Sequence, residues 1–72
     1  NSVSMKLVDD PDAIEKVANL FMESGYEIIS SSIEKKNDKY VCLYVIKARS
    51  HISPEEVTSL FSGKDYVLSV SV

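Results

Sequence analysis

The sequence predicts an α+β fold, a two-layer sandwich with the element order βαββαβ. Two observations predict it. Asp10-Pro11-Asp12 begins an amphipathic helix that ends at Gly25, and strand-like segments lie on both sides of it. Ser53-Pro54 begins a second, shorter helix that ends at Gly63, again between strand-like segments. The two halves of the chain therefore repeat one topology.

Periodicity in the first half defines a strand and a helix. Alternation of apolar and polar residues predicts a half-buried strand with Val3, Met5 and Leu7 toward the core. Asp10 is suited to cap the helix that follows. Pro11 is suited to its first position, since the N–H that proline lacks would have no partner there. Apolar residues then recur three and four positions apart, which predicts one buried stripe: Ile14, Val17, Ala18 and Phe21.

The middle of the chain reads as two strands joined by a turn. We expect a strand over Tyr26–Ile33, a polar connection over Glu34–Lys39 with its tip at Asn37-Asp38, and a third strand over Tyr40–Ala48. The third strand is apolar at every position from Tyr40 to Ile46. Such a strand is typical of the centre of a sheet, where both faces are covered.

The second half closes with a helix of about two turns and a last strand. Ser53 and Glu56 have the spacing of a capping box. The expected buried stripe of the helix is Val57, Leu60 and Phe61. In the final strand, Tyr66–Val72, apolar residues alternate with serines; the apolar ones are Leu68, Val70 and Val72.

Packed together, these elements predict the ferredoxin-like arrangement: a four-stranded antiparallel sheet with both helices on one face and right-handed crossovers. The other face then lacks a helix. If Val41, Leu43 and Val45 face the helices, the opposite alternation of the third strand faces outward, and either register leaves an apolar row. An open apolar row of this size usually marks an interface. The predicted interface residues are Tyr40, Cys42, Tyr44 and Ile46, and the predicted partner is a second copy or another domain.

Composition restricts the classes of function. The 72 residues form one domain, 1–72, and a chain that begins without Met suggests a piece of a longer protein. The net charge of −3 argues against nucleic-acid binding. The longest apolar run, Tyr40–Ile46, is far shorter than the roughly 20 residues that span a bilayer. A single cysteine can form neither an internal disulfide nor a cysteine-based zinc site.

Three carboxylates stand close together at Asp9, Asp10 and Asp12. Clustered oxygens suit a hard cation, but the glycine and glutamate of an EF-hand loop are absent, and acids at a helix N-terminus explain the cluster equally simply. No Cys-x-x-Cys pair indicates metal transfer, and Arg49 follows a strand where an acyl-phosphate hydrolase would need it in a glycine-rich cradle. We therefore expect no catalytic residue, no metal and no cofactor.

The pattern resembles ACT-like regulatory domains, in which a strand is followed by Asp-x-Pro-Gly-x-Leu at the start of a helix. Asp9 to Ile14 align with that motif, and Gly25-Tyr26-Glu27-Ile28 align with the start of the family's second strand. The resemblance implies regulation through dimerisation or a small effector bound near Asp9, Asp10 and Asp12. The family's glycine is Asp12 here, which stands against amino-acid binding.

The closing segment, Val67–Val72, resembles the end of the cytosolic C-terminal domain of MgtC/SapB-family membrane proteins. This resemblance implies a cytoplasmic appendage of a membrane protein associated with magnesium transport, without implying that the domain itself binds Mg²⁺. Two alternatives stay open: a structural assembly module with no ligand, and a free-standing amino-acid-sensing ACT domain.

Overall fold

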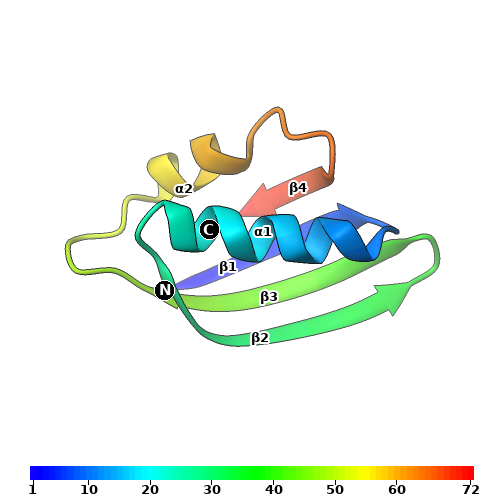
Figure 1. Cartoon of the computed structure of the whole chain (residues 1–72), viewed down its shortest axis with the longest axis horizontal. Helices are drawn as coiled ribbons and strands as arrows, with labels where there is room; N and C mark the ends of the chain where they lie inside the picture. The colour runs from blue at the N-terminus through cyan, green and yellow to red at the C-terminus, as the bar shows by residue number, and fades with distance from the viewer.

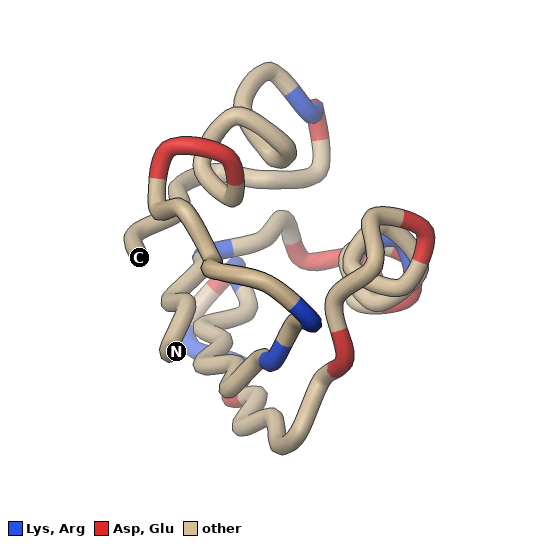
Figure 2. Tube along the Cα trace, turned by 90° about the vertical axis from the view of Figure 1, so that its left-hand side faces the viewer, with Lys and Arg blue, Asp and Glu red and all other residues tan.

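The computed structural model describes residues 1–72 and has the predicted element order (Figure 1). The strands are β1 (Ser2–Val8), β2 (Glu27–Lys36), β3 (Lys39–Lys47) and β4 (Val67–Ser71); the helices are α1 (Pro11–Glu23) and α2 (Pro54–Phe61). The strands form one antiparallel sheet in the order β2-β3-β1-β4, and both helices lie on the same side of it (Figure 2). The ferredoxin-like prediction is confirmed, with β1 and β3 at the centre.

Helix α1 begins and ends as its sequence predicts. The Asp10 carboxylate accepts a hydrogen bond of 3.0 Å from the backbone N–H of Asp12, and Pro11 occupies the first turn. The helix ends at Glu23, and Gly25 follows with φ at +87°, a left-handed conformation that glycine adopts without strain. Val17 and Phe21 of the expected stripe are fully buried, and Ala13 joins them.

Helix α2 is capped by Ser53, but with a different acidic partner from the predicted one. The Ser53 Oγ accepts the backbone N–H of Glu56 at 3.4 Å and donates its own proton to the carboxylate of Glu55 at 2.8 Å. That donated hydrogen bond lowers the pKa of the Glu55 carboxyl, because it stabilises the ionised form. The reciprocal bond expected from the Glu56 side chain is not formed.

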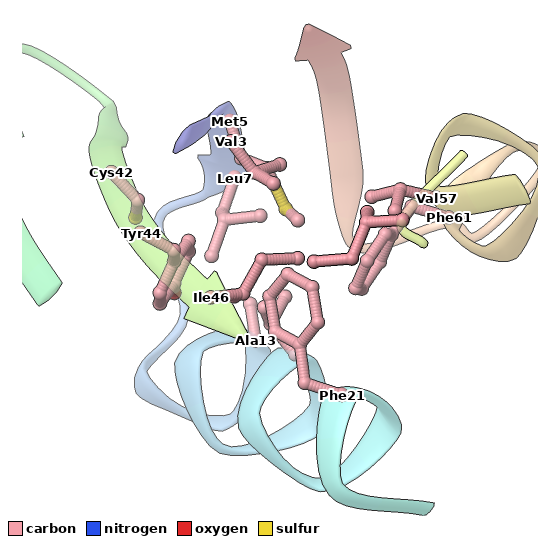
Figure 3. Close-up of a cluster of buried hydrophobic side chains, with 12 residues drawn as sticks. Val3, Met5, Leu7, Ala13, Phe21, Cys42, Tyr44, Ile46, Val57 and Phe61 are labelled. Carbon is pink, nitrogen blue, oxygen red and sulfur yellow. The ribbon is translucent and has the colours of Figure 1, made fainter. Parts of the chain in front are cut away.

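The core lies between the sheet and the two helices (Figure 3). Strand β1 contributes Val3, Met5 and Leu7, as predicted, and β3 contributes residues that were expected to form an interface. Cys42, Tyr44 and Ile46 are each only 2% exposed, and Tyr40 packs half-buried against the same cluster. The interface prediction for these four residues is wrong.

The pairing of β3 with β1 explains this correction. Val3 lies opposite Tyr44 and Met5 lies opposite Cys42, and directly opposed residues of an antiparallel pair point to the same face. Strand β1 has only one apolar face, so burying that face buries Cys42 and Tyr44 as well. A strand that is apolar on both sides takes its orientation from its amphipathic neighbour.

The last strand departs from simple alternation. Lys6 pairs with Ser69 and Leu7 pairs with Val67, so Leu68 is skipped in a β-bulge. Val67 and Val70 therefore pack against the core, whereas Leu68 is 56% exposed and Val72 is also exposed. Simple alternation would place Leu68 on the same face as Val70, but the bulge shifts Leu68 out of that register.

The hairpin between β2 and β3 is tighter than predicted. Lys36 pairs with Lys39, so the turn consists of Asn37 and Asp38 alone, and Asn37 has a left-handed φ of 58°. The tip is confirmed at the expected residues. The polar residues before it belong to β2, which is extended by this pairing to the end of Lys36.

Candidate interaction surface

The face of the sheet that the helices leave uncovered, here called the open face, has an apolar centre. Side chains alternate along β3, so the residues between the buried ones point away from the helices. These are Val41, Leu43 and Val45, which together are called the apolar row. Leu43 is 45% exposed, and its two neighbours in the row are half-buried. Figure 2, viewed from one end of the sheet, shows both helices on the opposite side.

Short or charged side chains flank the apolar row on both sides. Because opposed residues share a face, the strand register identifies them. Three lines of residues cross the open face from β2 through β3 to β1: Ser30, Val45 and Ser2; Ser32, Leu43 and Ser4; and Glu34, Val41 and Lys6. Strand β4 extends two of these lines with Ser71 and Ser69. The row is thus bordered by serines along most of its length and by one acid and one base near Val41.

A β-bulge in β2 places these serines. Ile28 pairs with Ile46 and Ser30 pairs with Val45, so Ile29 has no partner of its own. Ile28 therefore packs against the core, while Ser30 and Ser32 lie on the open face. The run of three serines at 30–32 is a strand segment with two of its members on this face.

The two charged flanking residues do not pair with each other within one chain. Glu34 and Lys6 lie two strands apart, about 10 Å at the usual strand spacing. The Glu34 carboxylate lies 3.7 Å from the Lys36 ammonium, and both side chains are more than half exposed. Such an exposed pair is weak, so Glu34 can meet a charge on another molecule, and Lys6 forms no ion pair within the chain.

The three aspartates of the predicted ligand site take part in different interactions. Asp10 caps α1, Asp12 supplies the N–H that it binds, and Asp9 lies 3.3 Å from the Lys35 ammonium on the neighbouring hairpin. The structure brings together no group of three His, Cys, Asp or Glu side chains that could hold a metal ion. The helix-cap interpretation is confirmed for Asp10, and a ligand at these three residues stays a prediction.

A polar hollow of about 530 Å³ lies at the other end of α1. The turn between α1 and β2 meets the loop between β3 and α2 there, at the left of Figure 1. The chain's only arginine and only histidine both line it, together with one acid. The lining residues are Ser24, Gly25, Tyr26, Ala48, Arg49, Ser50, His51 and Glu56. No sequence pattern predicts this hollow, because its two halves are distant in the chain and only the fold brings them together.

Burial makes Cys42 and Tyr44 poor candidates for catalysis. Loss of solvation raises the pKa of the Cys42 thiol, so the reactive thiolate is disfavoured. Burial also raises the pKa of the Tyr44 hydroxyl, and a charge on Cys42 would raise it further. The Tyr44 hydroxyl lies near the Cys42 thiol, which is a weak hydrogen-bonding group, but makes no hydrogen bond of regular geometry. Both groups are core side chains that stay neutral.

Comparison with models of known protein families and with curated proteins found no match. Neither helix has the length and apolar content that crossing a membrane would require. The open face and the polar hollow are the two surface features with the geometry of a binding site.

Proposed function

We propose that this chain is a non-catalytic regulatory or interaction domain that acts by pairing through the open face of its sheet. The apolar row is the observation that carries the proposal. Val41, Leu43 and Val45 lie along a central strand with no layer over them, and a partner would remove their apolar surface from water. The neighbouring serines are short, so they allow a second layer to approach the row closely.

The regulatory part of the proposal draws on the resemblance to ACT-like domains. The ferredoxin-like topology and the Asp10-Pro11 start of α1 are compatible with it. In such a module, a small effector that binds the paired form more tightly shifts the equilibrium between single and paired domains. A structural assembly module would pair through the same face with no effector, and response to an additive separates the two.

A narrower proposal is that the domain is appended to an MgtC/SapB-family membrane protein. Its support is the likeness of Val67–Val72 to the end of that family's cytosolic domain. The sequence of the gene on either side of this segment tests it. Several apolar stretches of about 20 residues upstream would support the proposal, and an upstream sequence without them would contradict it.

The pairing proposal is tested by measuring molar mass by light scattering over a range of concentrations. We expect a mass that rises with concentration and that stays at the monomer value in Leu43→Lys, which places a charge in the apolar row. Met22→Lys is the matched control, because Met22 is an exposed apolar residue on α1, away from the open face. Equal association of Leu43→Lys and the natural chain would overturn the proposal. Repeating the series with Mg²⁺ and with a pool of amino acids tests for an effector.

Small-ligand binding at the polar hollow is a second candidate function. The specific observation is that Arg49 and His51 line one hollow, with the Glu56 carboxylate also on its wall. A cationic and an anionic group at one site suit a small polar molecule. Titration of amide NMR spectra with acetate, inorganic phosphate and amino acids tests this candidate. Shifts confined to the hollow, and lost in Arg49→Gln, would support it; unperturbed spectra with all three probes would reject it.

A further inference from the structure

We infer that the partner of the open face is a second copy of this chain, related to the first by a twofold axis that runs within about 15° of the direction of β3 and above Leu43. This inference rests on the proposed pairing function and deepens it, because it names the partner and its orientation. Two opposite charges flank the apolar row. Glu34 lies on the β2 side of Val41, and Lys6 lies on the β1 side.

A twofold axis parallel to β3 exchanges the two flanks of the row. Strand β2 of the second copy then lies over β1 of the first, at the same level along the strands. Glu34 of each copy faces Lys6 of the other, so two opposite-charge pairs form, one on each side of the axis. The same rotation places the apolar rows over each other and brings serines over serines. The open face is therefore complementary to itself in both charge and polarity.

The charges select this axis over the other simple one. An axis across the strands through Leu43 would place Glu34 over Ser30 of the second copy and Lys6 over Ser2. Its only opposite-charge pairs would be Lys36 with Glu27, at the ends of the strands and farther from the apolar row than Glu34 and Lys6. Lys39 and Lys47 lie four residues from Leu43 at the ends of β3, about 13 Å away. A tilt of the axis by about 15° from β3 gives the crossing of about 30° that is usual for stacked sheets. This crossing separates the ends of facing strands and leaves these long side chains in water. Glu27, opposite Lys47, also offsets the charge at that end.

The size of the face sets the strength of the pair. Four strands at the usual spacing, with β3 nine residues long, cover about 19 Å by 30 Å, or roughly 500–600 Å² per copy. Twice that area is close to the lower limit of about 1,200 Å² for specific interfaces. We therefore expect a dimer with a Kd in the micromolar range, which forms or dissociates according to the local concentration of the domain.

Charge reversal tests the orientation by sedimentation equilibrium at low salt. We expect Lys6→Glu and Glu34→Lys each to raise the dimer Kd about tenfold, since each converts both attractive pairs into repulsive ones. The double variant restores both pairs in reversed order, so its Kd returns to within about threefold of the natural value. Lys64→Glu and Glu23→Lys make the same changes of net charge away from the open face and should leave the Kd unchanged.

Each alternative result has a separate meaning. A natural chain that is monomeric at millimolar concentration overturns the second copy as the partner. Two results would overturn the orientation while keeping pairing through the open face, provided that Leu43→Lys abolishes association. One is that neither charge reversal changes the Kd. The other is that the double variant has as high a Kd as either single variant. If Leu43→Lys also has no effect on an existing dimer, both the inference and the proposed function fail.

Discussion

Phe21 of α1 and Phe61 of α2 meet edge to face across the core, with ring centroids 4.9 Å apart and ring planes at 63°. Phe21 also lies edge-on to Tyr44 of β3, with centroids 5.5 Å apart. Edge-to-face contacts bring the positive edge of one ring to the negative face of the other, which adds to the gain from burial. One ring thus joins both helices to the sheet, and its removal should loosen all three elements.

We predict that Phe21→Leu lowers the free energy of unfolding by about 2 kcal/mol, through a small cavity and the lost aromatic contacts. At about 0.05–0.15 kcal/mol per residue, the whole domain has only about 4–11 kcal/mol, so leucine is a safer probe than alanine. Urea unfolding followed by circular dichroism measures the change. Met22→Leu, at the exposed neighbouring position, should change the value by less than about 0.5 kcal/mol. An equal loss in both variants would contradict the role of the Phe21 ring.

Tyr44→Phe should stabilise the fold. The Tyr44 hydroxyl is buried without a partner, and an unsatisfied buried hydroxyl costs about 1–3 kcal/mol. Its removal leaves the ring contacts intact, and we expect the free energy of unfolding to rise by about 1 kcal/mol. Tyr40→Phe, at a half-buried position on the same face of β3, is the control and should be nearly neutral. Destabilisation by Tyr44→Phe would show that the hydroxyl is hydrogen-bonded in solution.

Asp10→Ala should cost about 1 kcal/mol of stability, because it leaves the backbone N–H of Asp12 without its carboxylate partner. Asp9→Ala removes only an exposed ion pair with Lys35 and should cost less than about 0.5 kcal/mol. Chemical denaturation compares the two variants. If molar mass and response to Mg²⁺ or amino acids stay unchanged in both, Asp9 and Asp10 have structural roles alone. A change in either property would restore it as a ligand site.

Stability should fall as the pH rises above about 9. The folded state raises the pKa of Cys42 above its ordinary value of 9.0 and that of Tyr44 above 10.0, in both cases mainly by burial. The unfolded chain therefore releases these protons first and is favoured at high pH. Each group can contribute a slope of up to about 1.4 kcal/mol per pH unit between its unfolded and folded pKa values.

The double variant Cys42→Val, Tyr44→Phe removes both of these titrations. We expect its urea midpoint to fall less between pH 8 and pH 11 than that of the natural chain. Comparison of midpoints at intervals of one pH unit gives the two slopes. Equal slopes would show that other groups cause the alkaline loss of stability.

The open face could be predicted from the sequence only in part. An apolar row was expected there, and a row is present, but it is made of Val41, Leu43 and Val45. The pattern of β3 is apolar in both alternations, so nothing within that strand distinguishes its faces. The pairing of β3 with β1 determines which face is buried, because Val3 and Met5 form the only apolar face of β1 and lie opposite Tyr44 and Cys42. The polar hollow lay beyond prediction, since no local pattern links the Gly25 turn to Arg49.

The sequence by itself determined the order of the elements, the alternation of β1 and the ends of α1 at Asp10 and Gly25. These features depend on neighbours within one or two turns, where capping and periodicity act. Tertiary structure alone decided which face of β3 is open, where the bulges at Ile29 and Leu68 fall, and that Glu34 and Lys6 flank one apolar row. Each of these depends on strand pairing between distant segments, and a register is chosen by the burial of the whole sheet face at once.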